Sequence, residues 1–265
     1  MRKDHRPYLL KKASAGFVSW YARRYLIPQF RSMGKDPVFI RPWNVNVFGY
    51  NVTAGDHVMI IASPDANVNL ISWAQADLAD LSDIVSQDRK GVSVLAEKAS
   101  RSGKGIIEIG DYALICPGVR IHSATSVTIG SGAMLANSSY VTDSDWHGIY
   151  DRAQPVGLTA PVVIGENAWI GDHAIVTKGV TVGKNSIVGA GAVVTRSIPD
   201  NCVAAGNPAK VVKHLDENRP VNGRGVIYQD FEATRDLLEA ADRDAHRGHT
   251  FVTWLRAMLF PRYGD

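Results

Sequence analysis

The chain has little cysteine: Cys116 and Cys202 are the two among 265 residues. Two cysteines are too few for the disulfide framework of a small secreted domain, and such a count is typical of proteins from reducing compartments. Long apolar runs are also missing, because no stretch approaches the ~20 residues of a membrane-spanning helix. No apolar run followed by small residues marks a signal peptide. We therefore expect a cytoplasmic protein in which both cysteines are small buried apolar residues.

Acidic residues are scarce at the N-terminus. Residues 1–35 contain nine Lys and Arg and one acid, Asp4, so this segment carries a charge of +8. The whole chain carries +3, which leaves +3 − 8 = −5 for the remainder. A body of negative charge excludes nucleic-acid binding through its surface charge, whereas the basic segment suits an anionic partner surface.

The sequence does contain a repeat of six residues. From Ile164, six consecutive hexads begin with Ile or Val, and four of the six have glycine in second place. A period of six fits neither an amphipathic helix nor a single amphipathic strand. It fits short strands joined by tight turns that glycine permits. Three hexads would form one coil of a triangular prism, with the first residue of each hexad inward, and stacked coils would bury a continuous core.

The repeat extends beyond this run. Earlier first positions six residues apart are Ile109, Ile115, Ile121 and Val127, followed after a shift of two by Ile129, Leu135 and Val141. A weaker echo covers 38–62. We predict a β-helix over 37–212 with two insertions, one at about 72–105 that holds a helix and a turn-rich linker, and one at 143–161. An insertion in a solenoid projects from one face, often the binding face.

Helical appendages are predicted at both ends of the prism. Residues 1–36 form a basic N-terminal segment with an amphipathic helix over 7–27, which Pro28 ends. Residues 213–265 form a linker, a helix at about 230–246 and a basic, apolar tail. Three roles are open for the N-terminal helix: it caps the open end of the prism, lies on an anionic membrane surface, or docks a carrier protein.

The run from Ile129 to Leu215 resembles the hexapeptide-repeat acetyltransferases, in the branch of the maltose and galactoside O-acetyltransferases. Three features carry the resemblance: the hexads with Trp169, the loop Asp143–Arg152 that contains His147, and the closing segment 204–212. The resemblance implies left-handed coils, which are an exception to the right-handed crossover rule. It also implies a homotrimer with active sites between subunits. The N-terminal segment, the 72–105 insertion and the C-terminal tail lie outside it.

The projecting loop holds the candidate catalytic residues. Transfer of an acyl group from a thioester to a hydroxyl needs a base that takes the hydroxyl proton. His147 is the one histidine of the loop, its ordinary pKa suits this work, and the resemblance gives a loop histidine this role. Asp145 is near enough in sequence to orient the imidazole, although a turn-forming aspartate is an equal alternative. Asp143, Trp146 and Arg152 are assigned to the acceptor.

The resemblance implies acetyl-CoA as the acyl donor, bound along the groove between two prisms. Small residues and exposed cations of the later coils match such a surface. The candidates are Trp169, Gly171, Ala192, Ala204 and Gly206 for the acyl group and the pantetheine, and Lys178, Arg196 and Lys210 for the phosphates. No metal is expected, because the zinc-binding γ-class carbonic anhydrases of this helix use a His-x4-His pair that the sequence does not contain.

The predicted function is therefore acetyl-CoA-dependent O-acetylation of a sugar or polysaccharide precursor by direct transfer. Three alternatives stay open: an N-acetyltransferase that acts on an amino sugar, an acyltransferase that uses acyl carrier protein, and a scaffold β-helix without catalysis. His147 and the closing segment argue against the scaffold. A sugar nucleotidyltransferase is disfavoured, because no glycine-rich nucleotide-binding domain precedes the helix.

Overall fold

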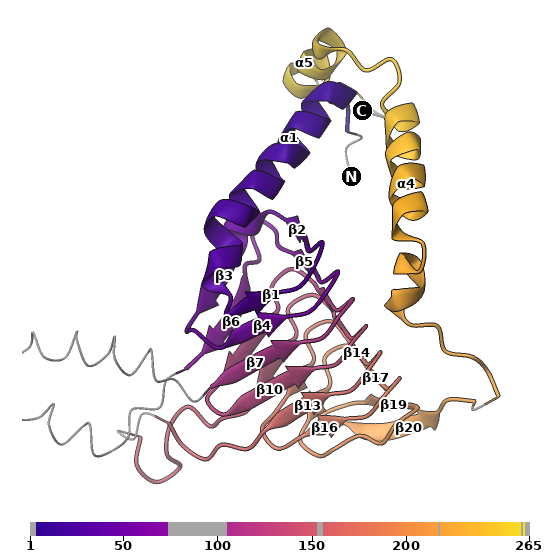
Figure 1. Ribbon diagram of the computed structural model, residues 1–265. Helices are drawn as coiled ribbons and strands as arrows, with labels where there is room; N and C mark the ends of the chain where they lie inside the picture. Colours follow the sequence, from indigo (N-terminus) through magenta and orange to yellow (C-terminus); the bar gives the residue numbers. More distant parts are fainter. Residues whose placement is uncertain (1–3, 74–104, 153–155, 217, 261, 263–265) are drawn as a thin grey trace, which may run out of the picture.

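The computed structural model describes residues 4–73, 105–152, 156–216, 218–260 and 262 (Figure 1). Its body is a prism with three walls, each wall a sheet of short strands. The first sheet contains β1 (Ser32–Met33), β4 (Val52–Ala54), β7 (Ile106–Ile109), β10 (Ser126–Ile129), β13 (Val162–Ile164) and β16 (Thr181–Val182).

The second sheet contains β2 (Val38–Ile40), β5 (Met59–Ile61), β8 (Leu114–Ile115), β11 (Met134–Leu135), β14 (Trp169–Ile170), β17 (Ile187–Val188), β19 (Cys202–Ala205) and β20 (Lys210–His214). The third sheet contains β3 (Val45–Phe48), β6 (Val68–Ser72), β9 (Arg120–Ser123), β12 (Tyr140–Thr142), β15 (Ile175–Val176) and β18 (Val193–Val194). Neighbouring strands are parallel, except β19 and β20, which close the prism as an antiparallel pair. A 3₁₀ turn, η3 (Pro42–Asn44), precedes β3.

The hexad register is confirmed by burial. The six first positions from Ile164 to Val194 are all fully buried, and stacked coils pair them, as Leu135 pairs with Ile170. The apparent shift of two residues upstream has a simple cause. Strand β10 is four residues long, so both Val127 and Ile129 point inward.

The N-terminal segment divides into two parts. Helix α1 (Tyr8–Tyr21) buries none of its residues and projects away from the prism (Figure 1). The π-helical turn η1 (Ala22–Leu26) and the 3₁₀ turn η2 (Ile27–Gln29) follow it. Ala22, Leu26 and Phe30 are buried in the main core. The expected cap therefore exists, but it is formed by residues 22–30 rather than by the whole helix.

The C-terminal segment returns along the edge between the first and second sheets. The amide of Leu215 donates to Asn201, and the ring of Tyr228 stacks on His57 with centroids 5.0 Å apart. After the 3₁₀ turn η4 (Arg224–Tyr228) come helices α4 (Phe231–Ala245) and α5 (Phe251–Leu259). The predicted helix at 230–246 is thus present, and the tail is helical too. The helix expected from residue 73 lies outside the described residues.

Helix α4 is tied to α1 by charged and polar pairs. The Tyr8 hydroxyl donates to Glu239 at 2.8 Å, Lys12 pairs with Glu239 at 3.0 Å, and Lys11 pairs with Asp242. The two ends of the chain are therefore joined to each other beyond the open end of the prism.

Candidate active site

The loop between β12 and β13 leaves the prism at the edge between the third and first sheets. The two arms of the loop are hydrogen bonded to each other at its base: Ala160 N donates to Asp143 O at 2.9 Å, and Gly157 N donates to Asp145 O at 2.6 Å. A Cβ on Gly157 would lie 2.3 Å from the carbonyl oxygen of His147, so this position requires glycine. The closed base of the loop thus fixes the backbone of His147.

Asp143 anchors the loop to the preceding coil. Its side chain is fully buried and accepts three hydrogen bonds, from the hydroxyl of Ser123 at 2.7 Å and the amides of Ala124 and Thr125 at 2.7 and 2.8 Å. These donors form the turn from the third to the first sheet one coil earlier. The carboxylate predicted to contact the acceptor is therefore engaged inside the protein, where it holds the loop in place.

Asp145 ties the same loop to the following coil. Its Oδ1 lies 2.6 Å from Nζ of Lys178, and each side chain is about one-third exposed. Lys178, predicted to contact a phosphate of the donor, is thus paired with the aspartate predicted to orient the base. A partly exposed pair of this kind adds little to stability, so its main effect is to position the loop.

Trp146 turns back over the outer surface of the third sheet. Its Nε1 donates to the hydroxyl of Tyr140 at 2.9 Å, and its ring lies edge-on to His122 with centroids 5.7 Å apart. Trp73, directly after β6, also packs on Trp146, with ring centroids 5.7 Å apart.

His147 and Arg152 are exposed at the tip of the loop. In the described part of the chain, no side chain hydrogen bonds to the imidazole of His147. The ring is therefore accessible to a substrate hydroxyl, with its backbone held from both sides of the loop.

Two of the predicted donor-binding cations, Lys178 and Arg196, lie on the later coils at the edge that carries this loop. Lys178 and Arg196 occupy equivalent corners in consecutive coils, because Val176 pairs with Val194 and each cation comes two residues later. The carbonyl of Gly206 accepts from Val193 N at 3.0 Å. Lys210 is exposed at the start of β20.

The other predicted donor residues lie elsewhere in this chain. Ala192 and Ala204 are fully buried in the core, so their side chains face the interior of the prism. Trp169, 45% exposed, lies on the second sheet, away from the edge that carries the loop. A Cβ on nearby Gly171 would lie 2.6 Å from the carbonyl of Val188, so this glycine allows two coils to stack closely.

Sequence reasoning missed a group of side chains beside Trp146, namely Phe48, Trp73, Arg120, His122 and Tyr140. Burial and the nearby charge of Arg120 lower the pKa of His122 to about 4, so this imidazole is neutral at pH 7. Arg120 and His122 are two residues apart on one strand and therefore share a face. That alternation is the only signal in the sequence, and it does not show which loop covers the face.

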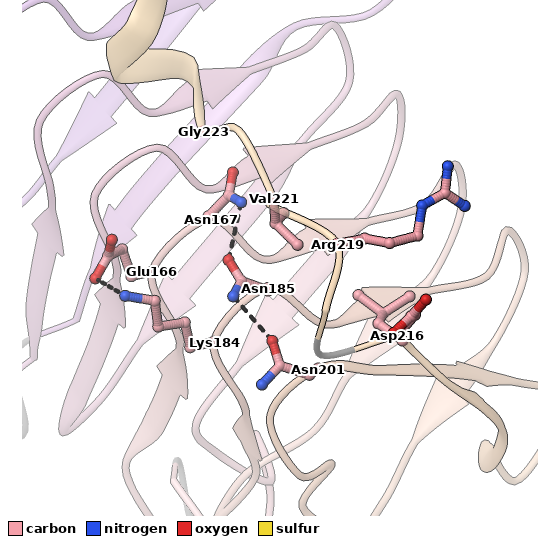
Figure 2. A pocket seen from close by; sticks show the side chains of 10 residues that line it. Glu166, Asn167, Lys184, Asn185, Asn201, Asp216, Arg219, Val221 and Gly223 are labelled. Atoms are coloured by element: carbon pink, nitrogen blue, oxygen red, sulfur yellow. Dashed lines mark hydrogen bonds and ion pairs between the residues drawn. The ribbon is translucent and has the colours of Figure 1, made fainter.

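A polar cleft separate from the loop lies on the edge between the first and second sheets, where Leu215, Arg219 and Gly223 contribute to its lining (Figure 2). Asn167, Asn185 and Asn201 form a ladder there, joined by hydrogen bonds of 3.0 and 2.9 Å, and Lys184 pairs with Glu166 at 2.9 Å. Each asparagine has a φ of 55–57°, a conformation that asparagine tolerates. The ladder supports the turns, and no predicted site residue lines this cleft.

Of the described helices, none is both long and apolar enough to cross a bilayer. The described residues also include no group of three or more His, Cys, Asp or Glu placed to hold a metal ion.

Comparison with known proteins places the repeats in a family. Residues 161–196 match the family described as Bacterial transferase hexapeptide (six repeats). The chain is 35% identical over 122 residues to a putative lipopolysaccharide biosynthesis O-acetyl transferase of Escherichia coli K12. This alignment covers 42% of this chain and 62% of the relative. It is 37% identical over 94 residues to the galactoside O-acetyltransferase of the same organism, 35% of this chain and 46% of the relative.

Among solved structures, the N-acyltransferase AntD from Bacillus cereus, in complex with dTDP and coenzyme A, aligns with a TM-score of 0.49 and 16% identity. The alignment covers 79% of this chain and 94% of that one. The chain spans less than two thirds of the length of the curated relatives named above. The match over residues 161–196 agrees with the predicted hexapeptide-repeat family, and the predicted fold class, a left-handed parallel β-helix of hexapeptide coils with helical segments at both ends, is confirmed.

Proposed function

Residues 161–196 carry the repeats of the bacterial transferase hexapeptide family, and from this premise we propose that the chain is an acetyltransferase. It transfers the acetyl group of acetyl-CoA to a hydroxyl of a sugar or of a polysaccharide precursor. The observation that carries the proposal is the exposed imidazole of His147, on a loop held by Asp143 to one coil and by Asp145 to the next. The relatives are named as a putative lipopolysaccharide biosynthesis O-acetyl transferase and a galactoside O-acetyltransferase, and these names support a sugar acceptor.

The proposed reaction is a direct transfer with His147 as general base. The imidazole takes the proton of the acceptor hydroxyl while the oxygen attacks the thioester carbonyl carbon. The tetrahedral intermediate then collapses, the carbon–sulfur bond breaks, and the imidazolium returns the proton to the departing thiolate of coenzyme A. Arg196 and Lys210, exposed on the later coils, suit the phosphates of the donor as charge-assisted partners.

We also propose a cytoplasmic homotrimer with its active sites between subunits, as the resemblance implies. A three-fold assembly closes through one repeated contact between unlike surfaces. It would bring residues of a neighbouring prism to the exposed loop, which would explain why Trp169 lies far from His147 within one chain.

Thiol release tests the proposed activity. Purified protein should release coenzyme A from acetyl-CoA in the presence of a sugar acceptor, at a rate that saturates with the acceptor. A panel of sugars and matching amino sugars distinguishes O-acetylation from N-acetylation, and acetyl loaded on acyl carrier protein tests the other donor. If no acceptor raises thiol release above the rate with acetyl-CoA alone, the chain is not a sugar acetyltransferase.

The arm formed by α1 and the turn after it suits a membrane surface. Its side toward α4 is neutralised by Glu239 and Asp242. Its other side exposes Phe17, Trp20 and Tyr25, which lie beside Trp43 of η3, and each of these four side chains is 43–54% exposed. Their rings form one cluster, in which Phe17 lies 5.7 Å from Trp20 and 6.4 Å from Trp43. Arg23 and Arg24 are exposed beside it. Aromatic rings flanked by arginines are typical of a helix lying in the headgroup region.

We therefore expect the full chain to sediment with vesicles of anionic phospholipid at low salt and less at high salt. Replacing Phe17 and Trp20 by serine should abolish sedimentation, because both rings would lose their place at the interface. Leu237→Ser with Leu238→Ser is the matched control, since these α4 residues are 71% and 63% exposed and lie outside the cluster. Full-length protein that stays in the supernatant at every salt concentration would end this proposal.

A further inference from the structure

The loop that carries His147 leaves the edge between the third and first sheets, with the earlier coils on one side of it and the later coils on the other. On the side of the later coils lie the cations Lys178 and Arg196. On the side of the earlier coils lies a set of ring side chains that we call the aromatic floor. It consists of Phe48, Trp73, His122, Tyr140 and Trp146.

The aromatic floor is continuous. Phe48 packs on Trp73 and Trp73 on Trp146, each pair with centroids 5.7 Å apart. Trp146 meets His122 at the same distance and donates its Nε1 hydrogen to Tyr140 at 2.9 Å. The strand register explains the alignment, because Phe48 and His122 both pair with Ile71 in neighbouring strands. Phe48 and Trp73 remain 51% and 40% exposed, so the floor is open to a ligand.

The charged side chain of Arg120 borders the aromatic floor. Arg120 lies over the ring of Tyr140, with its guanidinium carbon 4.4 Å from the centroid, and it is exposed. No carboxylate in the described part of the chain forms an ion pair with it. Two acids of the loop are engaged elsewhere, Asp143 with backbone amides and Asp145 with Lys178. A fixed, unpaired guanidinium beside neutral rings attracts an anion and offers it up to five donors.

The floor also adjoins the proposed base. Trp146 and His147 are neighbours in the chain, so their Cα atoms are about 3.8 Å apart. The floor and the donor-side cations lie on opposite sides of the loop. This is the arrangement that a transfer reaction between two substrates needs, with the reacting hydroxyl and the thioester meeting at the loop.

We propose that the aromatic floor is the acceptor subsite, and that it binds a sugar ring bearing an anionic group, a carboxylate or a phosphate. The apolar face of the ring lies on Trp73 and Phe48, and Arg120 binds the anionic group. This inference rests on the proposed acetyltransferase function and adds the class of acceptor and the residue that selects it.

The test compares three acceptors that differ in charge: glucose, glucuronate and glucose 1-phosphate. Binding is measured by saturation-transfer difference NMR, and turnover by thiol release from acetyl-CoA. Both anionic sugars, or one of them, should bind more tightly than glucose to the wild-type protein. Tighter binding of glucuronate alone assigns the anion as a carboxylate, and of glucose 1-phosphate alone as a phosphate.

Arg120→Gln should raise the KM for the preferred anionic sugar about 10- to 100-fold, the worth of a charge-assisted hydrogen bond. The KM for glucose and for acetyl-CoA should not change. Arg235→Gln is the matched control, because this exposed arginine lies on α4, where it pairs with Asp236 at 3.4 Å. Trp73→Leu should weaken the binding of all three sugars without changing the order of their affinities.

The outcomes separate this inference from the proposed function. Sugar-dependent thiol release without preference for an anion, unaffected by Arg120→Gln, keeps the acetyltransferase and overturns the acceptor subsite. Anion-selective sugar binding that Arg120→Gln abolishes supports the subsite even when no acetyl transfer is detected. If Arg120→Gln or Trp73→Leu instead changes the mass of the assembly in light scattering, the floor is a contact between subunits and the inference is wrong.

Discussion

Replacing His147 by alanine is expected to lower turnover by about 10²–10⁴-fold, the usual contribution of a general base. The imidazole is exposed at the tip of a loop whose backbone is fixed by Gly157 and whose flanks are tied down by Asp143 and Asp145. Loss of the ring therefore removes the group that accepts the hydroxyl proton, without removing a contact that supports the loop. Binding of acetyl-CoA, measured by calorimetry, should change little.

The same substitution, histidine to asparagine, at two positions makes this test specific. His147→Asn removes the base and should match the alanine variant. His173→Asn removes another exposed histidine, at a φ of 57° that asparagine tolerates, and should keep wild-type turnover. Turnover of the His147 variants within threefold of wild type would mean that another group serves as the base and that the assignment of this loop is wrong.

The prism could be predicted from the sequence because its determinant is local and periodic. Each hexad from Ile164 places one branched apolar residue inward, and the structure buries all six. The same geometry explains where the prediction of donor contacts is weak. The fifth residue of a hexad also faces inward at the corner, as Ala168, Ala174 and Ala192 show. Ala192 is small because the corner is narrow, and a small residue in the sequence does not by itself indicate a surface for a ligand.

The site could be predicted only in part, because its geometry depends on where the loop folds. The sequence indicated His147 and its neighbouring aspartates, but their partners come from other coils. Asp143 accepts a hydrogen bond from the amide of Ala124, and Asp145 forms an ion pair with Lys178. The aromatic floor joins β3, β6, β9 and β12 with the loop, and these pairings arise from stacking between coils. No local pattern encodes contacts such as Phe48–Trp73 and Trp73–Trp146, which join residues 25 and 73 positions apart.

The second large effect is expected at Asp143. In Asp143→Ala the hydroxyl of Ser123 and the amides of Ala124 and Thr125 lose their acceptor, and both Ser123 and Ala124 are fully buried. Buried donors without a partner are costly, since water cannot replace the lost bond. We expect the free energy of unfolding to fall by about 3–5 kcal/mol. Turnover should fall as well, because the loop that holds His147 loses its attachment to the preceding coil.

Asp145→Ala is the matched control in the same loop. Its carboxylate and the ammonium group of Lys178 are on side chains that are each about one-third exposed, so its loss should cost about 1 kcal/mol or less. Urea unfolding of both variants and the wild type, at one protein concentration because assembly contributes to stability, measures the difference. Equal urea midpoints of unfolding for Asp143→Ala and Asp145→Ala would show that the buried carboxylate of Asp143 does not support the turn at Ala124. A large loss in Asp143→Ala together with normal turnover would show that the anchor stabilises the prism but does not position the base.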